Sequence, residues 1–171
     1  IAQRGARFEP IISATACHQR NYVERYSRYK ARRGELRFPV PIGYIHDPGG
    51  EVRLDPDEQV QQVVRLIFRK FDEIGTLHGV LRYLVTHDVQ VGVREREGAA
   101  KGTLVWRRPN RMTLQNVLKN PIYAGAYAYG RRQVDARHKQ PGRPSTGRVT
   151  RTPQDYHVLL PEQVPAYITW A

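Results

Sequence analysis

A stripe of apolar residues at helical spacing runs through the middle of the chain. It begins at Val60 and recurs every three or four residues until Phe71. Such a stripe is typical of a helix with one face in a core. Asp55 at the head of the Asp-Pro-Asp-Glu segment 55–58 predicts an N-cap and a capping box, and Gly75 predicts the end. The expected core residues are Val60, Val63, Val64, Ile67, Phe68 and Phe71.

A second helix is predicted from Thr76, and a loop is expected over 88–103. The apolar residues of this helix repeat at the same spacing, which places them against the first helix. Its start signal is the Thr76 hydroxyl, a common N-cap. Its inward residues are expected to be Leu77, Val80, Leu81, Leu84 and Val85.

A third, shorter helix is predicted over 113–120. Thr113 matches an N-cap, and Asn120-Pro121 forces the chain out of helical geometry. Its apolar positions leave a polar side open to solvent, which suits contact with base edges or phosphates. The same polar side would also suit an ordinary surface helix in water. The buried residues are expected to be Leu114, Val117 and Leu118, and the open ones Gln115, Asn116 and Lys119.

The remaining pattern predicts strands and basic segments. Alternation over 42–54, broken by Asp-Pro-Gly-Gly at 47–50, predicts a β-hairpin. A helix is expected over 21–33, where three tyrosines on one face favour packing and the arginines suit the helix C-terminus. An extended basic arm is predicted in GELRFPVPIGY, from Gly34, where Pro39 and Pro41 impose an extended path that carries Arg37. After Tyr129 the chain is rich in Arg, Pro and Gly and predicts a flexible arm, and apolar character returns in a docked C-terminal segment.

These elements predict a mainly α fold with a β-hairpin, an α+β class. We expect a small, helix-turn-helix-like DNA-binding domain with basic arms, although the 88–103 loop is long for that motif. The expected divisions are residues 1–34, an N-terminal segment with a basic linker helix; 35–133, the DNA-binding domain; and 134–171, a flexible basic arm with a docked segment.

Charge is distributed unevenly along the chain. The net charge is +12, and residues 101–151 carry 12 Lys and Arg against one acidic residue, whereas residues 51–100 carry seven against nine. Clustered positive charge around a near-neutral core is the footprint of a polyanion binder, because neutralised phosphates release counterions. Solubility alone would not require this asymmetry.

Cysteine and hydropathy restrict the class of protein. Cys17 is the only cysteine, so neither an internal disulfide nor a cysteine-based zinc site is expected. No membrane span and no signal peptide are expected, and the single cysteine fits a reducing, cytoplasmic setting. Because the chain starts at Ile1 and ends abruptly at Ala171, we expect an excised fragment. No cofactor, metal or small-molecule substrate is expected.

Three alternatives remain at this point. Cys17-His18 and the acidic segment 55–58 could bind a metal, although no partner stands at ligand spacing for the first and capping explains the second. A tyrosine recombinase or nuclease would need a cluster of Arg and His on packed elements, whereas Arg137-His138 lies in the arm. A stand-alone DNA- or RNA-binding regulatory protein is the third, although RNA binding favours exposed aromatics on a sheet.

Four stretches together resemble the DNA-binding recombinase domain of the large serine recombinases. They are GELRFPVPIGY from Gly34, LDPDEQVQQVVRLIFRKF from Leu54, GTLHGVLRYLVTHDV from Gly75 and LKNPIYAGAYAYGRR from Leu118. The resemblance extends over roughly residues 20–171, and Trp106 belongs to it. It implies binding of double-stranded DNA at an attachment half-site during recombination by an integrase or transposase. It also implies a parent protein that acts as a dimer or tetramer on DNA, in the cytoplasm of a bacterium or phage-infected cell and associated with the nucleoid.

The chain departs from that family in several ways. It lacks the arginine-flanked catalytic serine motif and the zinc-binding cysteines, residues 1–19 match nothing expected, and the spacer 107–112 is longer than the commonest form. We therefore expect DNA binding without strand cleavage, the cleavage being left to the parent protein. The predicted DNA contacts are Lys30, Arg32, Arg33, Arg37, Arg107, Arg108, Arg111, Thr113, Gln115, Asn116, Lys119, Arg131 and Arg132.

Overall fold

The computed structural model describes residues 22, 25–143 and 146–170, and it divides the chain into two units at Leu36–Arg37. In the first unit a helix covers 25–32 and ends at Gly34, whose positive φ of 71° gives the left-handed exit that the sequence predicts. The packing expected for the tyrosine stripe is not seen. Tyr22 and Tyr26 are exposed and stack on each other, with ring centroids 6.4 Å apart. The interpretations placed on residues 1–19 and on Asn21 lie outside the described residues.

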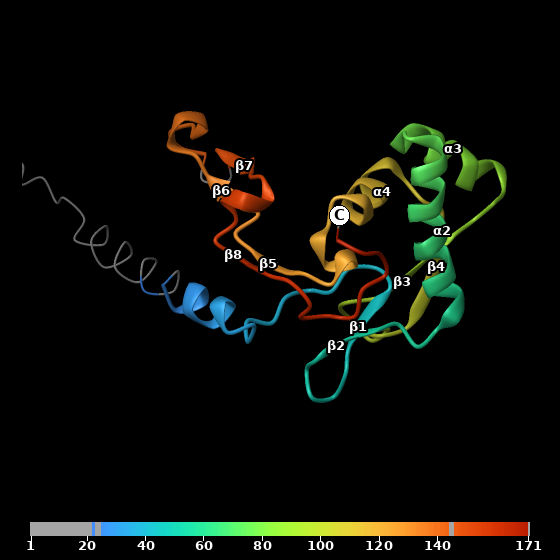
Figure 1. Cartoon of the computed structure of the whole chain (residues 1–171), viewed down its shortest axis with the longest axis horizontal. Coiled ribbons are helices and arrows are strands. Elements are labelled where there is room, and N and C mark those ends of the chain that lie inside the picture. The colour runs from blue at the N-terminus through green and yellow to red at the C-terminus, as the bar shows by residue number, and fades with distance from the viewer. Residues whose placement is uncertain (1–21, 23–24, 144–145, 171) are drawn as a thin grey trace, which may run out of the picture. The chain divides into compact units, whose positions relative to one another are not determined.

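The second unit has a core of three helices (Figure 1). These are α2 (Glu58–Ile74), α3 (Leu77–Thr86) and α4 (Arg111–Leu118), and each packs against the other two. Most of the predicted inward positions are confirmed, because their spacing of three and four residues puts them on one side of each helix. The buried members are Val60, Val64, Ile67, Val80, Leu84, Leu114 and Val117.

Asp57, not Asp55, is the N-cap of α2. Its carboxylate accepts hydrogen bonds from the backbone amides of Gln59 and Val60, at 2.8 and 3.2 Å. Asp55 lies two residues earlier, where it is buried and accepts from the amide of Asp57. The predicted capping box is therefore wrong, since the helix starts two residues later than the proline suggested. The end at Gly75 and the Thr76 cap of α3 are confirmed.

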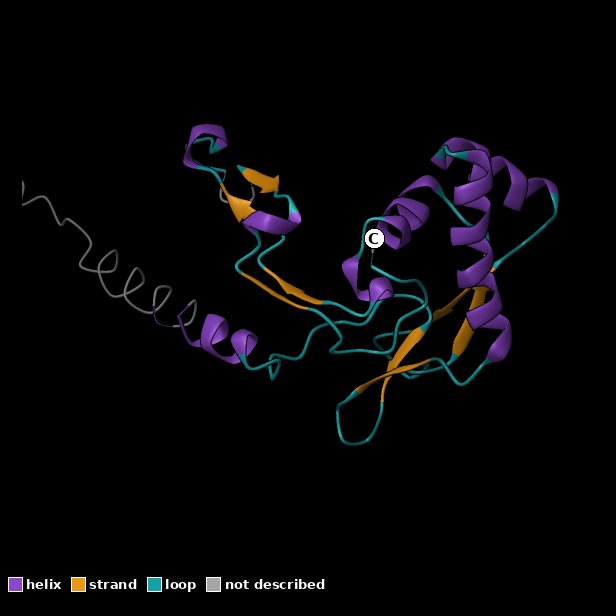
Figure 2. Ribbon diagram, in the orientation of Figure 1, coloured by secondary structure: helices purple, strands orange, loops and turns teal. Residues whose placement is uncertain are grey.

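The strands of the described residues form two-stranded antiparallel pairs, drawn in orange in Figure 2. The predicted hairpin is confirmed as β1 (Tyr44–His46) and β2 (Val52–Leu54). The predicted 88–103 loop is wrong in part, because β3 (Val91–Arg94) pairs with β4 (Leu104–Arg107). In β3 Val91 and Val93 alternate with Gly92 and Arg94. This alternation extends over only four residues and is followed by a charged turn, so it is too short to predict a strand.

The C-terminal part of the second unit also differs from the irregular arm that was expected. β5 (Tyr127–Tyr129) pairs with β8 (Val158–Leu160), and β6 (Arg132–Val134) pairs with β7 (Arg148–Thr150). Short 3-10 turns, η2 (Ala136–His138) and η3 (Pro153–Asp155), lie between the strands. Backbone hydrogen bonds between the strands order this region. The apolar pattern does not predict these strands, because half of the residues of each strand face solvent. The α+β class is confirmed, whereas the helix-turn-helix character and the three-part division remain predictions.

Candidate nucleic-acid interface

Helix α4 has a buried side and an outward side. Asn110 is the N-cap, and its side-chain oxygen accepts a hydrogen bond from the Thr113 amide at 2.8 Å. The N-cap expected at Thr113 is therefore wrong, and Thr113 lies in the first turn, where its hydroxyl donates to the same oxygen at 3.1 Å. Leu114 and Val117 are buried against the core, as predicted. The helix is thus capped and held by its apolar side.

The outward side of α4 carries Met112, Gln115, Asn116 and Lys119. These positions are separated by three, four and seven residues, so they follow one stripe along the helix. Asn116 and Lys119 are exposed, Gln115 is half-buried, and Met112 is 62% exposed. Met112 stands almost opposite the buried pair Leu114 and Val117, at the centre of the outward side. The residues predicted from the sequence do not include Met112, although its position four residues before Asn116 places both on the same side of the helix.

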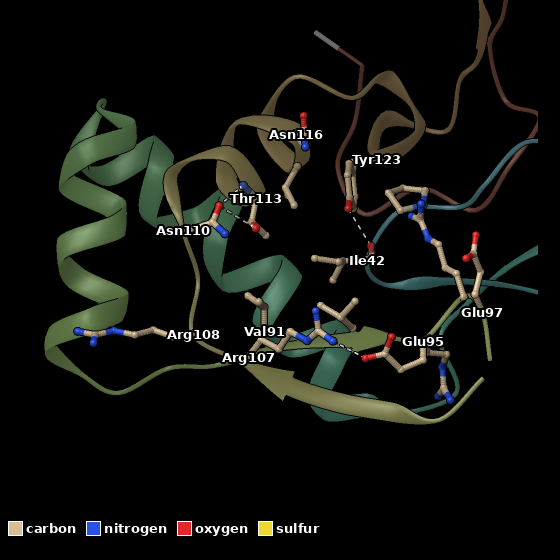
Figure 3. Close-up of a pocket in the computed structure, with 15 residues that line it drawn as sticks. Ile42, Val91, Glu95, Glu97, Arg107, Arg108, Asn110, Thr113, Asn116 and Tyr123 are labelled. Carbon is tan, nitrogen blue, oxygen red and sulfur yellow. Dashed lines mark hydrogen bonds and ion pairs between the residues drawn. The ribbon is translucent and has the colours of Figure 1, made fainter. Parts of the chain in front are cut away.

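A pocket of about 530 Å³ opens beside the first turn of α4 (Figure 3). The helix wall is formed by Asn110, Thr113 and Asn116, and the strand wall by the β3–β4 hairpin. On the strand wall Arg107 forms an ion pair with Glu95. Positive and negative side chains therefore meet at the pocket. The lining residues are Pro41, Ile42, Val91, Val93, Arg94, Glu95, Arg96, Glu97, Arg107, Arg108, Asn110, Thr113, Asn116, Val117 and Tyr123.

The predicted arginine contacts differ in how far they are engaged. Arg108 and Arg111, which flank the Asn110 cap, are exposed and have no side-chain partner among residues 22, 25–143 and 146–170. Arg37 is exposed in the same way. Arg107, by contrast, is neutralised by Glu95. The cations available next to α4 are therefore Arg108, Arg111 and Lys119.

In the first unit the predicted contacts lie on or just after the helix. Lys30 stands 4.9 Å from the ring centroid of Tyr26, a cation–π contact. Arg33 pairs with Glu35 at 2.6 Å. Arg32 is exposed. Exposed pairs of this kind are weak and can exchange for phosphate at small cost.

Arg131 and Arg132 are neighbours with different surroundings. The Arg131 guanidinium donates to Asn120 Oδ1 at 2.8 Å and to the Lys119 carbonyl at 3.0 Å. These acceptors lie at the C-terminal end of α4, where carbonyls lack partners within the helix. Arg132 is exposed on β6 and has no side-chain partner in the described part of the chain. Arg131 thus fixes the end of α4, and Arg132 is free to meet solvent.

Three tyrosine hydroxyls connect segments that are distant in the chain. The Tyr44 hydroxyl lies 2.9 Å from the Ile122 carbonyl and 2.8 Å from that of Pro165. The Tyr123 hydroxyl donates to the Ile42 carbonyl at 2.8 Å, and the Tyr167 hydroxyl to that of Gly43 at 2.6 Å. Burial raises the pKa of Tyr167 to about 12. These hydroxyls therefore stay protonated, and they tie the turn after α4 and the C-terminal segment to the β1 hairpin.

No group of three or more His, Cys, Asp or Glu side chains in the described ranges could hold a metal ion. Within those ranges no helix is both long enough and apolar enough to cross a membrane.

Comparison with known proteins identifies the family of this α+β domain. The family model described as Recombinase matches residues 58–171, which include α2, α3, α4 and the strands that follow. The chain belongs to this family, the recombinase domain of the serine recombinases. It is also 41% identical over 142 residues to the uncharacterized protein y4bA/y4pH of Sinorhizobium fredii (strain NBRC 101917 / NGR234). That alignment covers 83% of this chain and 20% of the relative, so the chain spans about a fifth of the relative's length. No solved structure matches it.

Proposed function

We propose that this chain is the DNA-binding domain of a site-specific serine recombinase, and that α4 reads one half of an attachment site. The family implies a role in recombination. The observation that carries the proposal is the outward stripe of α4, where exposed Asn116 lies between Met112 and Lys119 on a helix held by its opposite side. An α-helix fits the major groove, and an Asn side chain can pair with the edge of adenine.

The surrounding charges support the same placement. Arg108 and Arg111 stand before and at the start of α4 without acidic partners among the described residues, so phosphates on either side of a groove are suitable ligands for them. Lys119 is exposed at the other end of the helix. In this proposal Asn116 and the half-buried Gln115 read bases, and Arg108, Arg111 and Lys119 hold the backbone. Arg33 and Arg37 follow the minor groove as an extended basic arm.

Glu95 has a role in this arrangement. It pairs with Arg107 at the pocket beside α4, so Arg107 is not available to bind phosphate unless DNA displaces Glu95. The parent protein would supply strand cleavage and subunit assembly, since this chain lacks a catalytic serine motif. A dimer or tetramer on two half-sites follows from the same proposal, because recombination joins paired sites.

The test is selection of duplexes from a randomised DNA library by the whole chain, at low and near-physiological salt. An enriched motif that survives higher salt is expected. Asn116→Ala should relax selection at one position and cost roughly 1–3 kcal/mol on the preferred site. Gln62→Ala removes an exposed amide from α2 and is the matched control. If Asn116→Ala selects the same motif as the wild type, the assignment of α4 to the groove is wrong.

A further inference from the structure

The ribbon formed by β6 and β7 has two distinct faces. Its register pairs Arg132 with Thr150 and Val134 with Arg148, whereas Gln133 pairs with Val149. Alternate residues of a strand point to opposite faces, so the first two pairs share one face and the third lies on the other. Arg132, Val134, Arg148 and Thr150 are all exposed, and the exposed fraction of Val134 is 59%. We refer to this set of four as the outward ribbon face.

The opposite face is anchored to the rest of the unit. Gln133 and Val149 are half-buried. The side-chain amide of Gln133 donates to the carbonyls of Asp155 and Gly130, at 2.7 and 3.2 Å. The ladder continues through the Arg151 amide, which donates to the Arg131 carbonyl at 2.9 Å. The outward ribbon face therefore keeps its orientation, because its other side is hydrogen-bonded.

The charges of the outward ribbon face have no counterpart within the described residues. Neither Arg132 nor Arg148 has a side-chain partner there. Asp135, the only acidic residue between 101 and 151, is already engaged. It accepts from the Arg137 amide at 3.0 Å and lies 3.6 Å from the Arg151 guanidinium. Two like charges at diagonal positions of one ribbon face, about 7–8 Å apart at their Cα atoms, repel each other unless an anion lies across them.

We propose that the outward ribbon face is a second DNA-contacting surface, separate from α4, which holds the phosphate backbone. This rests on the proposed function for the identity of the polyanion. Guanidinium groups bind phosphate oxygens through paired hydrogen bonds, and Thr150 adds a hydroxyl for a further one. The face offers no amide side chain to read base edges. It therefore adds affinity and salt dependence without selecting sequence.

The test compares two double variants of equal charge. Arg132→Ala with Arg148→Ala removes the cations of the outward ribbon face. Arg69→Ala with Arg82→Ala removes two exposed arginines of α2 and α3 that likewise have no side-chain partner in the described ranges. Duplex affinity is measured from about 50 to about 200 mM salt. The ribbon variant should lower the salt slope by about 1.8, so its deficit relative to wild type shrinks roughly twelvefold over that range.

A contact measurement accompanies the salt series. Val134→Cys, made with Cys17→Ser because Cys17 is the only cysteine, carries an aryl azide that should crosslink to duplex DNA. Gln62→Cys on α2 is the control. Equal salt slopes for the two double variants, or no crosslink from position 134, would overturn the proposal. The lysine variant Arg132→Lys with Arg148→Lys should keep most of the slope, since charge is retained.

The outcomes separate this inference from the proposed function. If the wild-type chain binds no duplex, both fail together. If selection still depends on Asn116 while the ribbon variant matches its control, only the ribbon assignment fails. If the ribbon variant lowers the slope while Asn116→Ala leaves selection unchanged, the ribbon stands and the role of α4 is wrong.

Discussion

Arg94 holds the carboxylate of Asp55 with two hydrogen bonds of 2.7 Å, one from Nε to Oδ2 and one from Nη2 to Oδ1. Asp55 is 1% exposed, and it follows β2, whereas Arg94 ends β3. The pair therefore connects the β1–β2 and β3–β4 hairpins through two residues that are 39 positions apart in the chain. Because the carboxylate is buried, Arg94→Ala would leave it without a charged partner and should cost roughly 3 kcal/mol of unfolding free energy.

The same pair predicts a dependence of stability on acid. Desolvation alone raises the pKa of Asp55, but hydrogen bonds from Arg94 and the Asp57 amide, with the charge of Arg94, together outweigh it and lower the pKa. A lowered folded-state pKa means that the stabilisation is complete above the unfolded value of about 3.9 and is lost as pH falls below it. Urea unfolding between about pH 6 and pH 3 should show this loss. Asp55→Asn should be less stable at pH 6 and should show a smaller loss on acidification, and an unchanged pH dependence would contradict the assignment.

Arg131 and Arg132 should give opposite results when each is replaced by Ala. Arg131→Ala removes charged hydrogen bonds to Asn120 and the Lys119 carbonyl, so it should lower the unfolding free energy by roughly 1.5–3 kcal/mol. Arg132→Ala removes an exposed side chain and should change it by less than about 0.5 kcal/mol. Arg132→Ala is expected instead to lower the salt slope of DNA binding by about one. Chemical unfolding and salt titration of both variants check this, and equal stability of the two would contradict it.

Met112 gives a prediction about the DNA sequence that α4 prefers. An exposed apolar side chain at the centre of the outward side of α4 suits the 5-methyl group of thymine. We expect one enriched position of the selected site to be thymine. Replacing it with deoxyuridine removes only the methyl group and should weaken wild-type binding by about 0.8 kcal/mol, roughly fourfold.

Met112→Ala is the control for that measurement. The variant should bind the thymine and deoxyuridine duplexes equally, because the methyl group no longer meets an apolar partner. Deoxyuridine at other thymine positions should affect the wild type and the variant alike. A variant that discriminates between the two duplexes as strongly as the wild type does would exclude the contact.

Gly43 and Gly98 separate backbone strain from steric contact. Both have positive φ, 86° and 77°, so Ala at either position should cost about 1 kcal/mol through its backbone alone. A Cβ at Gly43 would also lie 2.7 Å from the Tyr167 hydroxyl and 3.0 Å from Val64 Cγ2. At Gly98, by contrast, no described atom outside the two neighbouring residues would lie within 4 Å of a Cβ. Gly43→Ala should therefore lose a further 1–3 kcal/mol, approximately, compared with Gly98→Ala in thermal unfolding. Equal losses would show that Tyr167 moves aside freely.

Much of the helical core was predictable because the signals are local. The stripe from Val60 to Phe71, the stop at Gly75 and the Thr76 cap each depend on neighbours within one or two turns. The residues that begin the helices were harder to predict. Asp55 and Thr113 are acceptable caps by residue type, yet Asp57 and Asn110 hold these places. A buried partner decided the case of Asp55, since Arg94 is distant in sequence and no local pattern indicates it.

By itself the sequence determined the helices α2 and α3, the β1–β2 hairpin, the apolar side of α4 and the excess of positive charge, because each follows from composition or from contacts between near neighbours. Only the tertiary structure decided which cations are engaged and which are open to a ligand. Arg107 is taken up by Glu95 and Arg131 by the end of α4, whereas Arg108, Arg132 and Arg148 face solvent. Only the tertiary structure likewise decided that β3 pairs with β4 and β6 with β7. Their paired residues lie 10 to 18 positions apart in the chain, so no short local pattern of polar and apolar residues predicts them.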